Sequence, residues 1–401
     1  MKKIIFVLVM ILAAIKTSGC RIRPQQPEPA YDAQLAPGQQ ALRKISNPYA
    51  VPDFTLACAD TAGLRTAAEH SLNYLQRPSS RRHFPCCGIT HEHAAASLKA
   101  FVKLLDAKLS ASELNREITE KFDVYMSVGY DNNGTVLFTG YYTPIFDGSP
   151  VRTNSFPYPL YKPPANLVKG PDGQILGLRR PDGQLVPCPP RAEIEKSGQF
   201  TGNELVWLGD AFEVYLCHVQ GSAKVRMPDG EIVTIGYAAS NGHEYRSVGE
   251  ELIKDGKITV DQMSLTSMMD YFAKHKEQID TYIQRNPRYI FFRKEGSAAH
   301  GSINVPVTAM RTIAADKSIF PRAGVVLVRT ELPVLKNGKV VNRFYSGFAL
   351  DQDTGGAIRA AGRCDIYMGV GETAGKLAGH TRQKGNLYYL FLKPDLIGAA
   401  D

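Results

Sequence analysis

The chain has 401 residues, 44% of them hydrophobic and 21% charged, which is typical of a soluble globular protein of about two to three domains. Its 47 Lys and Arg against 39 Asp and Glu give a net charge of +8, which favours an anionic partner such as a membrane surface or an acidic polysaccharide. We expect no nucleic-acid partner, because the body of the chain has no nucleic-acid motif and no concentrated Lys/Arg tract.

The first twenty residues have the pattern of a signal peptide. A cationic start precedes an apolar run over residues 4–15, which is too short to span a membrane. The run ends at Thr17-Ser18-Gly19-Cys20, which resembles a bacterial lipoprotein signal in which Cys20 is lipidated. Thr17 stands where such signals usually have Leu, so cleavage by a general signal peptidase is the alternative. Residues 21–49, rich in Pro and Gln at their start, are expected to form a flexible tether.

Six further cysteines lie in the mature chain. An exported protein meets oxidising conditions, so some disulfide pairing is expected, but the sequence does not define the connectivity, and the spacings match no metal site. Cys217 lies in a strand-like apolar run and is interpreted as a buried packing residue. Cys364 adjoins Asp365, but no nearby residue resembles the partner of a nucleophilic cysteine, so it is interpreted as a packing residue too. The six are Cys58, Cys86, Cys87, Cys188, Cys217 and Cys364.

Helical periodicity predicts helices over residues 61–76, 90–109 and 110–122, the last with the capping-box spacing of Ser110 and Glu113. His91 and His93 could suggest a metal site. Residues two apart on a helix point to different sides, however, so we expect both side chains to be solvated.

From residue 124 the pattern changes to strands and turns. A turn over residues 131–134 precedes a β-rich run over 135–144, and three Pro-Asp-Gly turns follow, at 171–173, 181–183 and 228–230. Residues 213–219 are predicted to be a strand that ends in Gln220-Gly221-Ser222. These features favour a small barrel or sandwich. A helical interlude over 248–254, 264–276 and 279–285 ends at Asn286-Pro287.

The C-terminal part is predicted to be a compact barrel of six short strands. The strands are expected at 289–292, 305–307, 324–328, 344–350, 366–367 and 387–392.

Two carboxylates lie at opposite ends of a Gly-Gly turn in this region. Asp353 precedes Gly355-Gly356-Ala357, and Asp365 follows Cys364 at the start of the next apolar run. Carboxylates held beside glycines indicate a groove that a large ligand approaches closely. The alternative for each Asp is a purely structural role in a turn or as a helix cap.

These motifs resemble a known family. Three segments carry its C-terminal three-aspartate domain: Arg311-Thr-Ile-Ala-Ala-Asp316, Asp353-Thr-Gly-Gly-Ala-Ile358 and Cys364-Asp365-Ile-Tyr367. Upstream segments at 138–144, 218–222, 236–237, 241–242 and 286–289 resemble, in the right order, the MltA family of membrane-bound lytic murein transglycosylases.

The resemblance implies a mainly β fold with peripheral helices. A double-psi β-barrel, residues 50–135 and 286–397 with a helical N-terminal part, would carry the catalytic acid. A second β-barrel domain, residues 136–285, would be inserted into it, with a glycan groove between the two.

The resemblance also implies a reaction. The family cuts the β-1,4 bond between N-acetylmuramic acid and N-acetylglucosamine in peptidoglycan and leaves a 1,6-anhydromuramyl end, with no metal and no cofactor. The expected partners are glycan strands and, through Cys20, the periplasmic side of the outer membrane, since no Asp follows Cys20. The protein is expected to be monomeric, with cell-wall remodelling complexes as further partners.

Site roles follow from the same match. Asp365 would be the acid, Asp353 would hydrogen-bond or tune it, and Asp316 would fix a loop. Substrate would contact Tyr141 or Tyr142, which alternate sides of a strand, and also Gln220, Gly221, Ser222, Gly355, Gly356 and Ala357. His218 is interpreted as a core histidine.

Two alternative functions stay open. One is a non-catalytic cell-wall binding lipoprotein, and the other is a plain glycan hydrolase that uses Asp353 and Asp365 as a pair.

Overall fold

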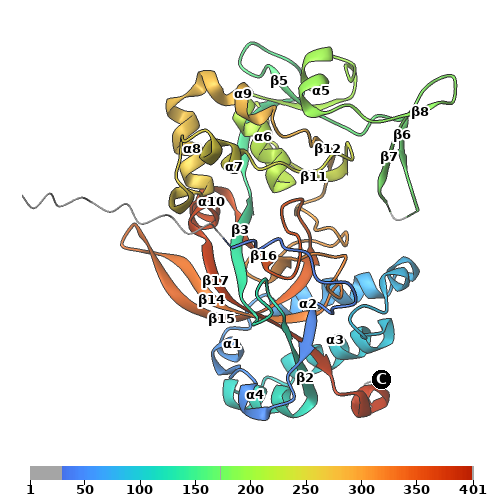
Figure 1. Cartoon of the computed structure of the whole chain (residues 1–401), viewed down its shortest axis with the longest axis vertical. Coiled ribbons are helices and arrows are strands. Elements are labelled where there is room, and N and C mark those ends of the chain that lie inside the picture. The colour runs from blue at the N-terminus through green and yellow to red at the C-terminus, as the bar shows by residue number, and fades with distance from the viewer. Residues whose placement is uncertain (1–28, 172, 400–401) are drawn as a thin grey trace, which may run out of the picture.

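The computed structural model describes residues 29–171 and 173–399 (Figure 1). The predicted signal peptide, the lipidation site Cys20 and the first part of the tether lie outside the described residues. Within that part the chain forms two β units with helices around them, and the first unit is a closed barrel. The predicted fold class, mainly β with peripheral helices, is therefore confirmed.

The first unit is a barrel whose strands come from distant parts of the chain. The strand order is β17-β14-β15-β13-β16-β3, and β3 pairs again with β17, which closes the barrel. Two short strands, β1 (Leu42–Lys44) and β2 (Phe122–Ser127), extend the sheet from β17. The barrel strands are β3 (Val136–Thr143), β13 (Thr312–Ala314), β14 (Val325–Lys336), β15 (Lys339–Asp353), β16 (Arg363–Val370) and β17 (Arg382–Leu392).

The predicted number of barrel strands is correct, but two of the predicted members are wrong. Residues 305–307 form no strand and only an isolated bridge between His300 and Pro306. The segment after residue 289 forms β12 (Ile290–Lys294), which pairs in the second sheet. Their places are taken by β3 and β13. Strand periodicity identifies a strand but not its partner, which is why β3, far away in sequence, was assigned to the wrong sheet.

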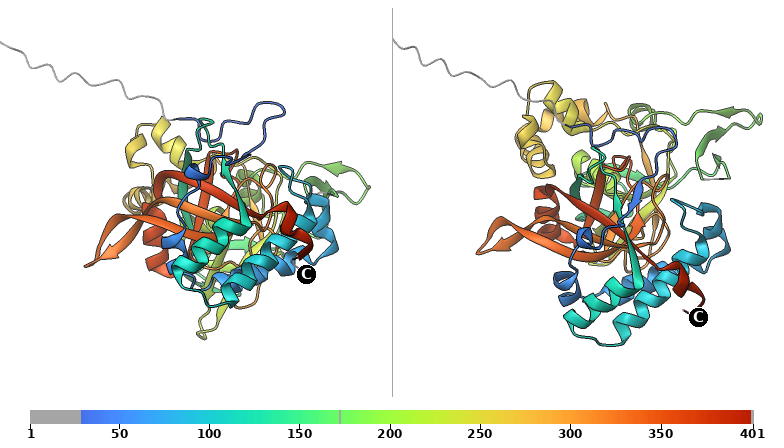
Figure 2. Two further views of the ribbon diagram at one scale, coloured as in Figure 1. Left: turned by 90° about the horizontal axis from the view of Figure 1, so that it is seen from below. Right: turned by 60° about the horizontal axis from the view of Figure 1, so that its bottom comes forward.

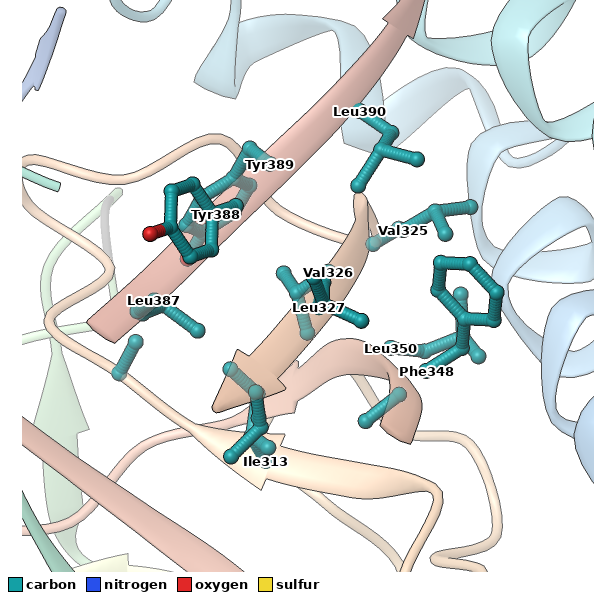
Figure 3. Packing of buried hydrophobic residues seen from close by; sticks show 14 of the residues in the cluster. Ile313, Val325, Val326, Leu327, Phe348, Leu350, Leu387, Tyr388, Tyr389 and Leu390 are labelled. Carbon is teal, nitrogen blue, oxygen red and sulfur yellow. The ribbon is translucent and has the colours of Figure 1, made fainter. Parts of the chain in front are cut away.

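The barrel strands are apolar on both faces because both faces are covered. Val325, Val326, Leu327 and Val328 are all at most 1% exposed. Figure 3 shows Val325, Val326 and Leu327 beside residues of the neighbouring strands, including Ile313, Phe348, Leu350 and Leu390. Four helices cover one end of the barrel (Figure 2): α1 (Thr55–Ala59), α2 (Leu64–Leu75), α3 (His91–Asp106) and α4 (Ala111–Lys121).

Of these four helices, α2, α3 and α4 agree with prediction and α1 was missed, and two histidines on α3 differ from their prediction. The capping box of Ser110 and Glu113 at the start of α4 is confirmed. The prediction that His91 and His93 are solvated was wrong, because α3 is covered on more than one side. His91 Nε2 lies 2.8 Å from Ser80 Oγ, and His93 Nε2 lies 2.6 Å from the Leu392 carbonyl oxygen.

The second unit is a curled sheet with helices packed against it. Its strand order is β12-β11-β10-β4-β9-β5, and its two edges approach each other, since the rings of Tyr161 on β5 and Tyr289 before β12 lie 6.3 Å apart. Its remaining strands are β4 (Ile145–Ser149), β5 (Tyr158–Tyr161), β9 (Glu204–Leu208), β10 (Ser222–Arg226) and β11 (Ile232–Ser240). A small three-stranded sheet projects from it, with β6 (Leu167–Lys169), β7 (Ile175–Arg179) and β8 (Leu185–Val186).

Six more helices accompany these sheets in the described residues. They are α5 (Arg191–Ser197), α6 (Ala211–Gln220), α7 (Val248–Lys254), α8 (Leu265–Lys274), α9 (Ile279–Ile283) and α10 (Gly371–His380). Short 3-10 helices are Pro48–Ala50, Pro78–His83, Val260–Gln262, Lys276–Gln278 and Pro394–Ala399.

The predicted strand over residues 213–219 was wrong, because these residues form helix α6. The Asp210 side chain accepts a hydrogen bond from the Phe212 N–H at 2.7 Å and caps the helix, and Gly221 ends it with φ of 74°. A cap and a terminal glycine therefore outweighed the strand-like composition of the segment. The accompanying prediction that Cys217 is buried is confirmed.

Two parts of the predicted tether pack against the rest of the chain, although most of its described residues are exposed. Leu42–Lys44 pairs with β2, and Tyr31 is 6% exposed, with its ring 4.8 Å from that of Tyr130.

The six cysteines of the described residues are free thiols, so the expected pairing is not observed. Among the described residues, no helix is long and apolar enough to span a membrane.

Candidate active site

A cavity of about 490 Å³ lies where the two β units meet. Both units supply its walls. The second unit contributes Arg191, His218, Val219, Gln220, Gly221, Ser222, Tyr237, Ala238, Tyr245, Asn286, Arg288, Ile290 and Arg293. The barrel side contributes Tyr141, Ala299, His300, Gly301, Ser302, Asn304, Val307, Ala314, Asp353, Thr354, Gly355, Gly356, Ala357, Ile358, Arg359, Arg363 and Asp365.

Strand register places the two predicted carboxylates on either side of one small residue. Strand β13 lies between β15 and β16, and its Ala314 is opposite Asp353 on one side and Asp365 on the other. The two Cα atoms are therefore two strand spacings apart, about 10 Å. All three residues line the cavity, and the methyl group of Ala314 leaves the space between the carboxylates open.

Asp365 has the properties of a proton donor. Burial raises its pKa to about 6, against the opposing effects of the Arg363 charge and a hydrogen bond from Thr139, while the negative charge of Asp353 raises it further. Its Oδ1 atom is buried and has no hydrogen-bond partner among the described residues. A carboxyl group with an unused oxygen and a raised pKa holds a proton more readily than an ordinary Asp.

Asp353 is held by three donors instead. Its Oδ1 accepts hydrogen bonds from the Ser302 and Thr354 N–H groups, both at 2.8 Å, and its Oδ2 accepts one from the Tyr141 hydroxyl at 2.9 Å. Burial raises the pKa of Asp353, and these hydrogen bonds oppose that rise. Asp353 is thus fixed in position, with both oxygens occupied.

The close approach at Asp353 requires a glycine at position 301. A Cβ atom on Gly301 would lie 2.6 Å from the Gln352 carbonyl oxygen and 3.3 Å from the Asp353 Cβ. A larger residue here would displace the segment whose Ser302 N–H binds Asp353.

Asp316 lies outside the cavity. It is 2% exposed, and its Oδ1 accepts hydrogen bonds from the Ser318 N–H at 3.0 Å and the Ser318 hydroxyl at 2.6 Å. Its Oδ2 accepts one from the Ala360 N–H at 2.8 Å. Asp316 therefore connects the segment after β13 to the loop that carries Gly355, Gly356 and Ala357.

Tyr141 and Tyr142 face opposite ways, as expected for adjacent strand residues. Tyr141 lines the cavity, and its ring is tilted against that of Tyr367 at 5.2 Å. Tyr142 is 5% exposed and packs against α10 at Gly375, where a Cβ atom would lie 2.7 Å from its ring. Only Tyr141 is placed to contact a ligand in the cavity.

The segment from Gln220 to Ser222 lines the cavity at the end of α6 and also joins the two units. The Tyr142 N–H donates to Gln220 Oε1 at 3.0 Å, so the amide oxygen of Gln220 is already used by the barrel. Ser222 Oγ lies 3.2 Å from Thr143 Oγ1, which is 2.8 Å from the Tyr367 hydroxyl.

His218 is a buried histidine with a structural contact, in line with its interpretation as a core residue. Arg191 Nη2 donates to His218 Nδ1 at 2.9 Å, and the Ile290 N–H donates to the same atom at 3.2 Å. Burial, together with the Arg191 charge, holds the pKa of His218 well below its usual range. His218 is therefore neutral, with the proton on Nε2.

Several residues of this site were not singled out from the sequence. The Gly-Gly turn approaches the second unit, because a Cβ atom on Gly356 would lie 3.2 Å from Tyr245 Cβ and 3.5 Å from Arg288 Nε. Arg191 is fully buried, with its guanidinium 5.2 Å from the Tyr289 ring. A buried arginine between aromatic rings leaves no periodic signal in a sequence.

Within the described residues, no group of three or more His, Cys, Asp or Glu side chains is arranged to hold a metal ion.

Comparisons with known proteins agree on one family. Residues 137–293 match the model of the MltA specific insert domain, and residues 311–391 match that of the 3D domain. Over 295 residues the chain is 30% identical to the membrane-bound lytic murein transglycosylase A homolog of Buchnera aphidicola subsp. Schizaphis graminum, covering 73% of this chain and 75% of that protein. It is 31% identical to membrane-bound lytic murein transglycosylase A of Escherichia coli K12 over 276 residues, 68% and 70% of the two chains.

Solved structures support the same assignment. The crystal structure of E. coli MltA with bound chitohexaose has a TM-score of 0.67 and 25% identity, covering 88% of this chain and 95% of that one. The membrane-bound lytic murein transglycosylase of Agrobacterium tumefaciens has a TM-score of 0.73 at 24% identity, covering 90% and 100%, and so supports the fold. The chain therefore belongs to the MltA family of membrane-bound lytic murein transglycosylases.

Proposed function

We propose that this protein is a peptidoglycan lytic transglycosylase and that Asp365 is its single acid and base. The observation that carries the proposal is the Asp365 carboxyl, which has a raised pKa and an unpartnered oxygen in a cavity between the two units. The names of the similar proteins support the reaction class, and the chitohexaose bound to E. coli MltA supports an oligosaccharide as the kind of ligand.

One carboxyl group can serve both steps of this reaction. Protonated Asp365 gives its proton to the glycosidic oxygen as the bond from that oxygen to C1 of the muramyl residue breaks. The ionised carboxylate then accepts the proton of the muramyl 6-hydroxyl as O6 bonds to C1. No water enters, because the substrate supplies its own nucleophile at high effective concentration.

We assign Asp353 a positioning and electrostatic role. Its carboxylate, fixed by Ser302, Thr354 and Tyr141, lies across Ala314 from Asp365 and raises the pKa of the acid. Its negative charge also favours the positive charge that develops at C1 in the transition state. Asp316 acts at a distance by bracing the Gly355–Ala357 loop.

We assign substrate contacts to the cavity wall. Tyr141 can stack on a sugar ring, and Ser222, Gly221 and the loop residues Gly355, Gly356 and Ala357 can approach hydroxyl and acetamido groups. Tyr142 is not included, because its ring packs away from the cavity.

The pH dependence of kcat/KM tests the role of Asp365. The acid must carry its proton, so kcat/KM is expected to fall about tenfold per pH unit above pH 6. Because the charge of Asp353 raises the pKa of Asp365, Asp353→Asn should move this alkaline limb to lower pH. Rates of anhydromuropeptide release measured across the pH range check both points, and an alkaline limb that D353N leaves in place contradicts the assignment.

Two alternatives make different predictions. A hydrolase that uses Asp353 and Asp365 together would add water, so its products would be heavier by one water than anhydro products. A non-catalytic cell-wall binding lipoprotein would release nothing, with or without Asp365. The raised pKa of Asp365 favours a catalytic role for this carboxyl group over a role in glycan binding or in holding the fold together.

We also propose domain boundaries and a location. The sequence-based division places the inserted domain at 136–285, whereas strand pairing favours about 144–294, since β3 belongs to the barrel and β12 to the second sheet.

The membrane-bound relatives support a cell-envelope location, and we propose a lipid anchor on Cys20 at the outer membrane. Mass spectrometry of the mature N-terminus distinguishes this anchor from general signal-peptidase cleavage.

A further inference from the structure

A second cavity, of about 350 Å³, adjoins the proposed active site. The two cavities share Ser302 and Asn304, so the segment around residues 301–304 forms the wall between them. On one side of this wall the Ser302 N–H binds Asp353. On the other side the wall faces residues of α2 and of the 3-10 helix Pro78–His83.

The second cavity is strongly basic. Arg77, Arg82 and Arg322 line it together with His83, and none of its lining residues is an Asp or Glu. Arg322 also acts on Asp351, where it lowers the pKa, but that carboxylate is fully buried and bonded to Lys317 and the Tyr389 hydroxyl. The positive charge of the cavity is therefore not neutralised from within its own wall.

Two buried donors in this cavity lack partners. Tyr74 is 6% exposed, yet its hydroxyl has no hydrogen bond among the described residues, and neither has Arg322 Nε. Burial raises the pKa of Tyr74, while the charges of Arg322, Arg82 and Arg77, which line the same cavity, act to lower it. Unpartnered buried donors next to cations are the chemistry that an anion satisfies.

Arg77 also forms hydrogen bonds with the segment that separates the two cavities. Its Nη1 donates to the Ile303 carbonyl oxygen at 3.3 Å, and its Nη2 donates to that of Asn304 at 3.1 Å. It therefore holds the shared wall in place. An anion that binds beside Arg77 would contact the same segment that positions Asp353.

We propose that this basic cavity, the anion pocket of Tyr74, Arg77, Arg82 and Arg322, binds a carboxylate of the peptide stem carried by the muramyl residue in the active site. The inference rests on the proposed function, because the stem leaves the sugar at its lactyl group and must run along a wall of the groove. A stem of about four extended residues reaches about 14 Å, enough to pass from the groove to an adjoining cavity. Arginine and phenol donors match carboxylate oxygens.

The first test measures binding without turnover. Calorimetry with a free tetrapeptide stem, which the enzyme does not cleave, should show binding that is about tenfold weaker in Arg322→Gln and lost in the double variant R82Q/R322Q. Tyr74→Phe, which removes only the hydroxyl, should also weaken binding. Arg116→Gln, an exposed arginine on α4 outside both cavities, is the matched control and should bind as the wild type does.

The identity of the ligand is tested by two competitors. A tetrapeptide with its carboxylates amidated should not bind. If it binds as well as the free acid, or if inorganic phosphate binds in an arginine-dependent way while the acid peptide does not, the proposal is overturned.

The second test separates this proposal from the proposed function. With peptide-bearing glycan strands, R82Q/R322Q should lower kcat/KM about tenfold, and with strands whose peptides have been removed it should leave kcat/KM unchanged. Equal rates for wild type and variant on both substrates contradict the anion pocket and leave the lytic function supported. Arginine-dependent peptide binding by a protein that cleaves neither substrate contradicts the proposed function and supports the pocket.

Discussion

Asp365→Asn is expected to lower kcat for anhydromuropeptide release by about a thousandfold, the scale of a lost general acid and base. The amide has nearly the same shape but cannot give a proton to the leaving oxygen or take one from the 6-hydroxyl. Binding of an oligosaccharide should persist, because Tyr141, Ser222 and the Gly355–Ala357 loop are untouched. The measurement is muropeptide release from purified sacculi, with oligosaccharide binding measured by calorimetry on the same samples.

Asp229→Asn is the matched control for this substitution. Asp229 lies in an exposed Pro-Asp-Gly turn, where it accepts a hydrogen bond from the Glu231 N–H at 2.9 Å, and it is outside the cavity. Its variant should release muropeptides at the wild-type rate. If D365N releases muropeptides at the wild-type rate, Asp365 is not the catalytic acid. Circular dichroism of D365N shows whether the variant is folded, so that a loss of activity through unfolding is recognised.

Phe348→Ala should be the most destabilising single change in the barrel core, at about 3–5 kcal/mol. The Phe348 side chain on β15 is fully buried in the core (Figure 3). Its ring lies 5.8 Å from that of Phe54 and 5.4 Å from that of Phe101. The substitution leaves a cavity where the N-terminal helices meet the barrel. Urea unfolding followed by far-ultraviolet circular dichroism gives the change in the free energy of unfolding.

The same strand supplies the control for this prediction. Phe344 is 57% exposed, in the part of β15 that projects beyond the barrel, and the guanidinium of Arg329 lies 5.7 Å from its ring. Phe344→Ala should cost less than about 1 kcal/mol. Equal losses at positions 344 and 348 would mean that the packing between helices and barrel contributes little to stability.

The sequence identified the two carboxylates but could not show how they meet. Asp353 and Asp365 were visible beside a Gly-Gly turn, and the family resemblance separated their roles. Their alignment depends on Ala314, on a three-residue strand that inserts between β15 and β16. Such a short strand has too few residues to show periodicity, and its neighbours follow it by many residues in the chain.

Two other sequence-based predictions were wrong because the rest of the fold, and not the local pattern, decided the outcome. Residues 213–219 have strand-like composition, but Asp210 and Gly221 cap them as a helix. His91 and His93 look solvated on an isolated helix, yet the 3-10 helix that carries Ser80 and the end of β17 cover them. Local pattern describes one element at a time, whereas burial is decided by what packs against it.

The basic cavity illustrates a further limit. Arg77 and Arg82 lie close together in the chain, but Arg322 joins them only because the segment before β14 folds back beside α2. No charge count along the sequence could distinguish this cluster from ordinary surface arginines. The unpartnered Tyr74 hydroxyl is likewise visible only in the folded chain.

The most direct test of the central claim is the source of the oxygen in the product. The protein should be incubated with glycan strands in water labelled with a heavy oxygen isotope, and the masses of the new chain ends should be measured by mass spectrometry. If the muramyl 6-hydroxyl is the nucleophile and Asp365 transfers its proton, every new end is a 1,6-anhydromuramyl end that contains no heavy oxygen. New reducing ends that carry one heavy oxygen would instead show that water attacks, and they would contradict the account given for Asp365.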